Sequence, residues 1–202
     1  MNNTKTKRPF TILTFLFTIG VVLYIYFWYI GPILEIHEMA QDRINYIAFN
    51  EIGNETNQTL LIYKILEWEK NNIVNLYEKP DYPCQIRIPS PVYPTFQDSY
   101  LVIITRCGKC GEFAEIFSEI ANTFQIENRI ILAHHVNRTK DNDLSHAWVE
   151  VISGGKIIPI QTMETDGYNS SDFYSCKYIM KYRNITILNG ENVSERYYSW
   201  CS

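Results

Sequence analysis

The stretch TRCGKCGEFAEIF, residues 105–117, decides the fold, because it sets a cysteine where a helix is expected to begin. Cys107 and Cys110 lie three residues apart, and a glycine follows each of them. Apolar residues continue at helical spacing to Phe124, so Cys110 is predicted to start an amphipathic helix. The cysteine pair could be half of a metal site, a disulfide, or a nucleophile beside a structural neighbour.

Cys110 has the local features of a nucleophile. Unpaired N–H groups and the helix dipole favour an anion in the first turn, which would lower the pKa of the thiol. Gly108 and Gly111 would let a substrate approach the backbone, whose N–H groups could bind a developing oxyanion. Zinc would need a second ligand pair at similar spacing, but the other cysteines are isolated: Cys84, Cys176 and Cys201. The local pattern therefore disfavours zinc and leaves the nucleophile and disulfide interpretations open.

A predicted strand presents the histidine that such a nucleophile requires. Residues 145–152, SHAWVEVI, alternate strictly, with one face formed by His146, Trp148 and Glu150. The SGGK turn at 153–156 should lead into a partner strand at 157–161, and residues 129–136 read as a further strand. The fold class is therefore α+β, with the nucleophile helix packed on an antiparallel sheet. Three other histidines, His37, His134 and His135, are less suited to act as the base.

The N-terminal part contains an apolar segment without charge, residues 10–34. Its first 21 residues would form a helix of about 30 Å, the thickness of a bilayer's hydrocarbon core. The run is too long for a signal peptide and lacks a small-residue cleavage site, so we expect one uncleaved transmembrane helix. Basic residues within 1–9 place that end in the cytoplasm, and residues 36–202 become one catalytic domain outside the cell membrane.

Charge and glycan acceptor sites agree with that location. The chain has 18 basic and 22 acidic residues; removing the three basic residues before the apolar segment leaves 15 against 22, which gives no nucleic-acid footprint. Six Asn-x-Ser/Thr acceptors follow the segment, at Asn54, Asn57, Asn137, Asn169, Asn184 and Asn192. Helices are expected at 36–49 and 60–77, and the tyrosine-rich tail 168–202 is left unassigned.

The combination of TRCGKCGEFA, SHAWVE and IPIQ resembles the transglutaminase-like (papain-like) superfamily of cysteine enzymes, and most closely the peptide:N-glycanases. The similarity covers roughly residues 60–168 and includes a weaker match at 64–84, around a tryptophan-containing helix. It implies that Cys110 is the nucleophile and His146 the base of a thioester mechanism without a cofactor. Gly111 and Trp148 are expected to line the site.

Two departures from the family pattern stand out. The aspartate of the family's third position is replaced by Gln161, which can orient an imidazole but supplies no charge; Glu164 and Asp166 are possible substitutes. The family's four-cysteine metal site is reduced to Cys84 and Cys107, too few ligands for a metal. In an oxidising location the four remaining cysteines could pair as Cys84–Cys107 and Cys176–Cys201.

The resemblance implies a membrane-anchored amidohydrolase that removes N-linked glycans from glycopeptides or unfolded glycoproteins. Alternatives within the same fold are a protease or an acyl-transferase. A catalytically silent glycan- or peptide-binding module is a further alternative, which Gln161 keeps open. Thiol–disulfide exchange through Cys107 and Cys110 is disfavoured, because the match also includes His146, which an exchanger does not need.

Overall fold

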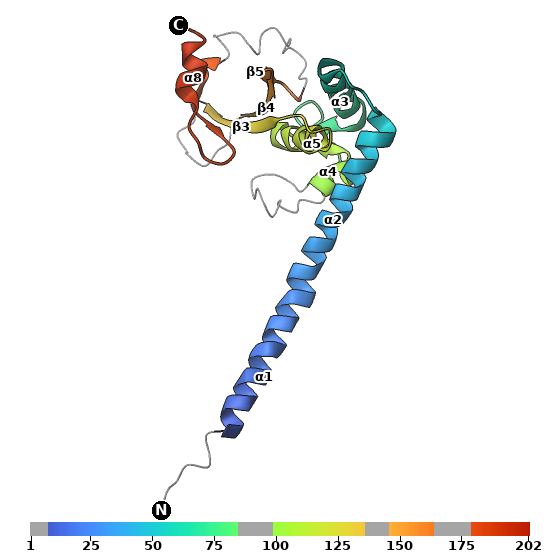
Figure 1. Cartoon of the computed structure of the whole chain (residues 1–202), viewed down its shortest axis with the longest axis vertical. Coiled ribbons are helices and arrows are strands. Elements are labelled where there is room, and N and C mark those ends of the chain that lie inside the picture. The colour runs from blue at the N-terminus through green and yellow to red at the C-terminus, as the bar shows by residue number, and fades with distance from the viewer. Residues whose placement is uncertain (1–7, 85–98, 136–145, 164–178) are drawn as a thin grey trace, which may run out of the picture. The chain divides into compact units, whose positions relative to one another are not determined.

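The computed structural model describes residues 8–84, 99–135, 146–163 and 179–202 (Figure 1). The chain divides into two compact units, Met1–Gln41 and Asp42–Ser202. Each unit is described on its own.

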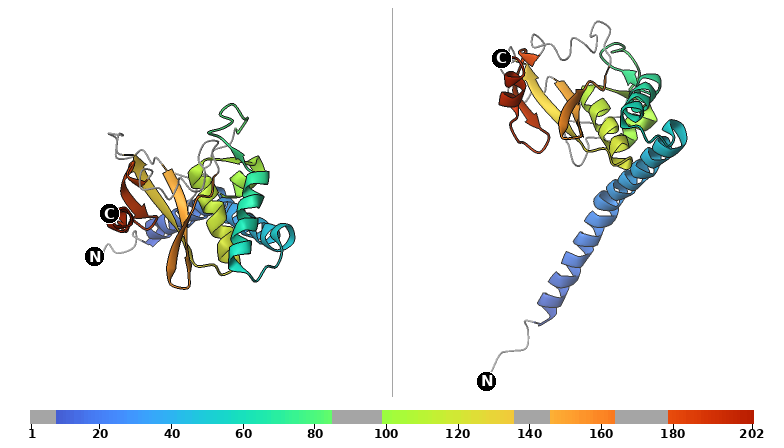
Figure 2. Two further views of the ribbon diagram at one scale, coloured as in Figure 1. Left: turned by 90° about the horizontal axis from the view of Figure 1, so that it is seen from above. Right: turned by 45° about the horizontal axis from the view of Figure 1, so that its top comes forward.

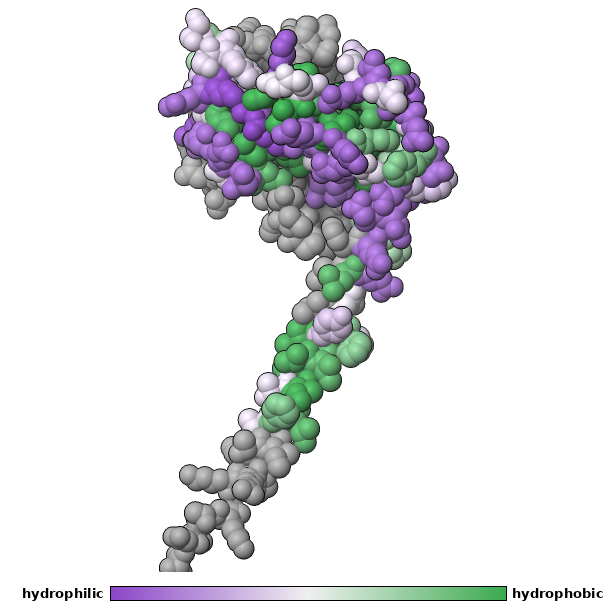
Figure 3. Space-filling model, viewed as in Figure 1, coloured by the Kyte–Doolittle hydropathy of each residue, from purple (hydrophilic) through white to green (hydrophobic). Residues whose placement is uncertain are grey.

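The first unit is helical throughout its described length. It contains α1 (Arg8–Ile25), a π-helical segment η1 (Tyr26–Ile30), and the beginning of α2 (Gly31–Tyr46). Large apolar side chains are exposed along it (Figure 3), including Phe17 and Trp28. Within the described residues, no helix combines the length and the apolar character needed to cross a membrane. The transmembrane helix predicted at 10–34 is therefore not confirmed; the apolar stretch is divided among these three segments.

The second unit contains the nucleophile helix and three helical segments that contact it. They are η2 (Ile47–Ile52), α3 (Gln58–Asn72), α4 (Ser99–Thr105) and α5 (Cys110–Thr123). The Asn57 side chain caps α3 by accepting a hydrogen bond from the Leu60 N–H at 3.1 Å. The helix expected from residue 110 to about 124 is confirmed by α5.

The helix predicted at 60–77 is wrong beyond Asn72. There the chain becomes extended and forms β1 (Val74–Asn75), which pairs in parallel with β2 (Cys107–Gly108). The β-branched Ile73 and Val74 favour this extended form, and the Val74 N–H donates to the Arg106 carbonyl at 2.7 Å. This pairing fixes the segment after α3 beside the cysteine motif.

The second unit contains a four-stranded antiparallel sheet in the order β5-β4-β3-β6. Its strands are β3 (Asn128–His135), β4 (His146–Ser153), β5 (Lys156–Ile160) and β6 (Tyr182–Ile187). The β4–β5 hairpin turns through Gly154 and Gly155, whose φ angles of 57° and 75° suit the two central positions of a tight hairpin turn. The predicted strands and turn are confirmed. The unassigned tail supplies β6 and α8 (Ser194–Ser199).

The two faces of β4 belong to two separate hydrophobic cores. Ala147, Val149 and Val151 pack with α3 and α5 in the larger core, and the views in Figure 2 show α5 lying against the sheet. Trp148, on the other face, packs in the smaller core with side chains of β6 and α8, including Tyr197. The alternation predicted from SHAWVEVI is therefore confirmed, and each face has its own partner.

A buried carboxylate ties this second face together. The fully buried Glu150 accepts hydrogen bonds from Arg129 Nε and Arg196 Nη2, each at 2.6 Å, and from the Tyr197 hydroxyl. Burial raises the pKa of Tyr197, so its hydroxyl stays protonated and remains a donor. The Tyr197 oxygen also accepts a hydrogen bond from Trp148 Nε1 at 2.8 Å. Two cations and one hydroxyl thus compensate a charge that would otherwise be costly to bury.

Replacing Arg196 with methionine should lower the free energy of unfolding by about 2–4 kcal/mol, because Glu150 then keeps only one cationic partner. Denaturant unfolding of the Arg196→Met variant measures this loss. The matched control is Lys64→Met, which removes a more exposed ion pair with Glu55 and should cost less than about 1 kcal/mol. Equal losses in the two variants would contradict a structural role for the Glu150 cluster.

Candidate active site

Cys110 is the first residue of α5, and its thiol lies beside the first residues of β4. Its side chain is buried, and it is the free cysteine of the described residues. The thiol has a backbone hydrogen bond with Ala147, the residue after His146, and its Sγ lies 3.9 Å from the Tyr77 hydroxyl. The packing of α5 on β4 therefore brings the predicted nucleophile to the strand that carries the predicted base.

Burial determines the protonation state of this thiol. Desolvation raises the pKa of Cys110 above its ordinary value, and the nearby Glu112 carboxylate adds to the rise. Hydrogen bonds from Ala147 and Tyr77 oppose it only in part. The expected lowering of the pKa by the helix N-terminus is therefore wrong. Burial outweighs the dipole, and Glu112, which accepts the Lys109 N–H at 2.9 Å, adds negative charge to the same turn.

His146 forms the hydrogen bond expected of an oriented base. Its Nε2 lies 3.1 Å from Oε1 of Gln161, the residue that directly follows β5. Because a glutamine Oε1 only accepts, Nε2 carries the ring proton and Nδ1 is left unprotonated, as a general base requires. Burial lowers the pKa of His146 to about 4. As the pH falls from 6.5 to 4, His146 takes up a proton more readily in the unfolded chain, so the folded state loses stability. In the folded chain the imidazole stays neutral down to about pH 4.

Gln161 thus occupies the predicted third position. The possible substitutes, Glu164 and Asp166, lie outside the described residues. With a neutral amide as its partner, the imidazole is oriented by a hydrogen bond, and its cationic form receives no charge stabilisation from that side.

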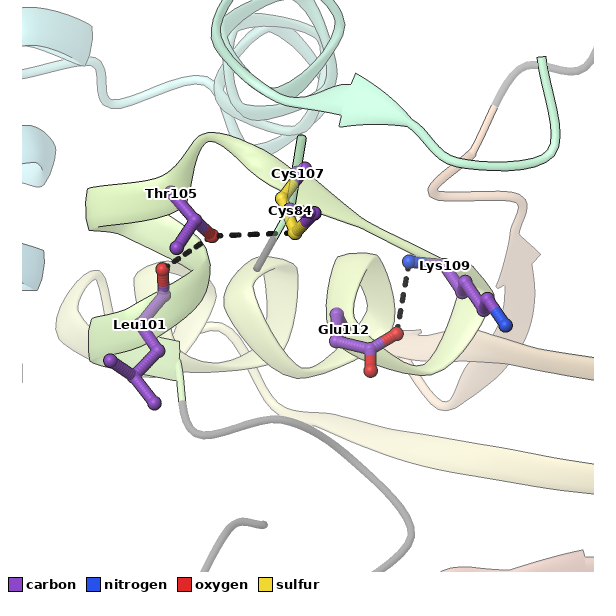
Figure 4. Close-up of a disulfide and its surroundings, with 6 residues drawn as sticks. All are labelled: Cys84, Leu101, Thr105, Cys107, Lys109 and Glu112. Atoms are coloured by element: carbon purple, nitrogen blue, oxygen red, sulfur yellow. Dashed lines mark hydrogen bonds between the residues drawn. A yellow bond between two sulfur atoms is a disulfide. The ribbon is translucent and has the colours of Figure 1, made fainter. Parts of the chain in front are cut away.

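The first cysteine of the motif, Cys107, is structural. Cys107 forms a disulfide with Cys84, as Figure 4 shows, which confirms the first predicted pair. The Thr105 hydroxyl donates to the Leu101 carbonyl at 2.7 Å and lies 3.8 Å from Cys84 Sγ. Since Cys107 is bonded to Cys84, it does not form an exchange pair with Cys110. Cys201 is also disulfide-bonded, and its predicted partner Cys176 lies outside the described residues.

The remaining predicted site residues have mixed outcomes. A side chain at Gly108 would place a Cβ 3.0 Å from Glu112 Cβ, so the close approach of the cysteine loop to α5 requires glycine. Gly111 is buried in the first turn of α5. Trp148 does not line the site, because it is fully buried; its ring lies 5.8 Å from that of His146 and supports it from the second core.

Tyr77 is a site residue that the sequence did not predict. Asn75 Oδ1 accepts its backbone N–H at 2.9 Å, and the Leu76 N–H donates to the Gly108 carbonyl at 3.0 Å. The ring is half-exposed, and the ammonium of Lys109 lies 5.8 Å from its centroid. The only signal for it was the weak family match at 64–84, which named no residue at this position.

Four of the six predicted glycan acceptors lie in the described residues, and all four side chains are exposed: Asn54, Asn57, Asn184 and Asn192. Asn57 caps α3, and Asn192 Oδ1 accepts the Ser194 N–H before α8. Asn137 and Asn169 lie outside the described residues.

Substitutions at Gln161 should move the pKa of His146 in opposite directions. Gln161→Glu should raise it above about 4, because a facing carboxylate favours the imidazolium. Gln161→Met should lower it further, because the hydrogen bond to Gln161 is what raises this pKa against burial. An NMR titration of the His146 ring measures both. Shifts in the same direction, or no shift, would show that Gln161 does not contact the imidazole in solution.

The unfolded, unreduced chain should contain one reactive thiol. Five cysteines less the Cys84–Cys107 pair and a second pair that includes Cys201 leave Cys110 alone. A thiol count in denaturant before and after reduction should give one and then five. A count above one before reduction would contradict this pairing.

Comparison with known proteins shows the family of the chain. The profile of the transglutaminase-like superfamily matches residues 47–162, more than half of the chain. No curated protein matches the sequence. Two solved structures are similar: a proposed cysteine protease from Cytophaga hutchinsonii (20% identity, TM-score 0.45) and a proposed protease from Parabacteroides distasonis (13% identity, TM-score 0.49).

These two structures are larger proteins. The aligned regions cover 60% and 78% of this chain, but only 37% and 27% of the respective solved chains. The family profile, in contrast, spans α3, the cysteine motif, β4 and Gln161. The superfamily's members are usually cysteine-dependent hydrolases or acyltransferases. By this match, the chain belongs to the transglutaminase-like superfamily.

Proposed function

We propose that the protein is a cysteine-dependent amide hydrolase that forms a thioester on Cys110, and that its substrate is the side-chain amide of a glycosylated asparagine. The observation that carries the proposal is the hydrogen bond between His146 and Gln161, because His146 is on β4, the strand whose next residue, Ala147, contacts the Cys110 thiol. The proposed nucleophile is on α5, the proposed base is on β4 and the orienting group directly follows β5, and the contact of Cys110 with Ala147 links the first two elements next to His146.

The reaction begins from a neutral pair. Because burial raises the pKa of the thiol and lowers that of the imidazole, the resting forms are thiol and neutral histidine. As Cys110 Sγ attacks the amide carbonyl, its proton passes to His146 Nδ1. The imidazolium then protonates the leaving glycosylamine as the C–N bond breaks, which leaves a thioester. Water activated by the same histidine hydrolyses the thioester to aspartate and free thiol.

Two donors are available for the oxyanion of the tetrahedral intermediates. One is the Cys110 backbone N–H at the first position of α5, where helix N–H groups lack an intrahelical partner. The other is the Tyr77 hydroxyl, 3.9 Å from the sulfur. The ammonium of Lys109 over the Tyr77 ring makes the phenol a better donor, because it favours negative charge on the ring.

The neutral third residue is compatible with catalysis. A carboxylate would stabilise the imidazolium by charge, and its loss from a serine-type triad costs about 10⁴ in kcat. Cysteine enzymes tolerate an amide at this position, as the Cys-His-Asn arrangement of papain-like proteases shows. Gln161 therefore supports an active enzyme more readily than it would beside a serine nucleophile.

The choice of a glycosylated substrate rests on sequence and surroundings. The motifs TRCGKCGEFA and SHAWVE resemble those of peptide:N-glycanases, and the half-exposed Tyr77 ring offers an apolar face for a sugar beside the nucleophile. A location outside the cytoplasm is part of the same proposal. The Cys84–Cys107 disulfide supports it, because such bonds persist in oxidising compartments.

The full chain should convert a denatured N-glycopeptide to the glycan-free peptide with a gain of about 1 Da at the former asparagine, as expected for amide hydrolysis to aspartate. Mass spectrometry of the products measures this, and Cys110→Ala should abolish it. Loss of the glycan in both proteins would exclude Cys110 as the nucleophile.

Other products separate the alternatives. Cleavage of the peptide backbone, or incorporation of an added amine, would contradict the glycan substrate and indicate a protease or an acyl-transferase with the same nucleophile. An unchanged peptide with both proteins would contradict enzymatic activity and favour a binding module.

A further inference from the structure

His146 is flanked by two aromatic rings. The ring of Tyr182 lies 5.8 Å from the imidazole, centroid to centroid, with an interplanar angle of 22°. The ring of Trp148 lies at the same distance with an angle of 32°, and the two aromatic rings lie 6.2 Å from each other. These contacts shield the imidazole from water and limit its rotation, while Gln161 holds Nε2.

Tyr182 reaches His146 across an intervening strand. In the sheet, β3 separates β6 from β4, so these two residues do not pair directly. Tyr182 pairs with His135, and His146 pairs with Ala133. Ala133 is fully buried in the same core as Tyr182, and its small side chain leaves room for the tyrosine ring to contact the imidazole.

Three consecutive residues of α8 hold this arrangement. The Tyr198 hydroxyl donates to the Tyr182 backbone carbonyl at 2.9 Å. Tyr197 accepts the Trp148 indole N–H at 2.8 Å, and Arg196 pairs with Glu150 at 2.6 Å. A hydrogen bond therefore ties the indole of Trp148 to the C-terminal helix, and another ties the backbone of Tyr182 to it.

This support lies outside the family core. The superfamily profile ends at residue 162, whereas β6 and α8 follow residue 178. The aromatic contacts also bear on the glutamine, Gln161, that stands where the family pattern has an aspartate. A neutral glutamine orients the imidazole by a weaker hydrogen bond than a carboxylate would, so the aromatic contacts carry more of the orientation.

We infer that Tyr182 is a positioning residue for His146, and that α8 holds it in place so that a C-terminal extension of the superfamily core completes the catalytic site. Tyr182 acts through His146 and is not assigned a contact with substrate. The assignment rests on the proposed role of His146 as the base. Glu150, the charged residue on the same face of β4, is already compensated by its two arginines.

The test compares Tyr182→Phe, which keeps the ring, with Tyr182→Leu, which removes it. The first readout is an NMR titration of the His146 ring in the full chain. His146 should remain neutral at pH 5 in the native protein and in Tyr182→Phe, as burial dictates. In Tyr182→Leu water reaches the ring, so its midpoint should rise above pH 5 toward that of a solvated imidazole. The control Tyr63→Leu, at an exposed position of α3, should leave the titration unchanged.

The second readout is the rate at which iodoacetamide alkylates Cys110 at pH 7. Tyr182→Leu should slow it about tenfold, because a mobile imidazole takes up the thiol proton less well. Tyr198→Phe keeps every ring and removes only the hydroxyl that holds Tyr182, so it tests the clamp even if Tyr182→Leu does not fold. It should move both readouts in the same direction by a smaller amount, about threefold in the alkylation rate.

An unchanged titration in Tyr182→Leu would overturn the inference, even if the variant were less stable, because a purely structural role alters stability without moving the pKa of His146. Unchanged behaviour of Tyr198→Phe would overturn the role of α8. Neither readout uses a substrate. A native protein that shows both effects but cleaves no glycopeptide would contradict the proposed function and leave this inference standing.

Discussion

The packing of α5 against β4 is the interaction on which the active site depends. Ala147, Val149 and Val151 form the face of β4 that meets the helix, and this contact brings Cys110 to the backbone of Ala147. His146 precedes that residue on the same strand. The proposed nucleophile therefore lies against the strand segment that carries the proposed base, because a helix start and a strand start are packed together. The disulfide and the β1–β2 pair keep the cysteine loop in this position.

This packing buries the Cys110 thiol and the His146 imidazole, and their burial sets their protonation states. It raises the pKa of the thiol and lowers that of the imidazole, so both groups rest in their neutral forms, and in the proposed reaction charge develops only during attack on the substrate. A neutral orienting residue fits such a site better than it would fit a resting ion pair. In the proposed mechanism, Gln161 and the aromatic contacts of His146 take over the orienting role of the missing carboxylate.

The central part of the fold could be predicted because its signals are local. The alternation of SHAWVEVI, the glycine turn and the apolar face after Cys110 each require one element, and the structure contains all three. Cys84–Cys107 followed from the cysteine count together with the family resemblance. The end of α3 at Asn72 was missed, because it depends on the pairing of β1 with β2, 33 positions later in the chain.

The features that the sequence did not predict depend on contacts between residues far apart in the chain. Tyr182 and Tyr197 contact residues 34 to 49 positions earlier, and no periodicity in the tail indicates this. The thiol pKa was predicted in the wrong direction, because a helix start can be read from sequence whereas the desolvation of a side chain cannot. Trp148 was assigned to the site because it shares a face with His146, although that face is covered by the second core.

The central question is whether His146 takes the proton from Cys110. The iodoacetamide alkylation rate of Cys110 at pH 7 should be compared between the native chain and His146→Gln, with the unfolded chain as the reference for an unassisted thiol. If His146 takes this proton, the native thiol should react at least about tenfold faster than the thiol of the variant, as general-base assistance requires. Equal rates in the native chain and the variant would contradict it, because Cys110 would then be a buried cysteine without a base.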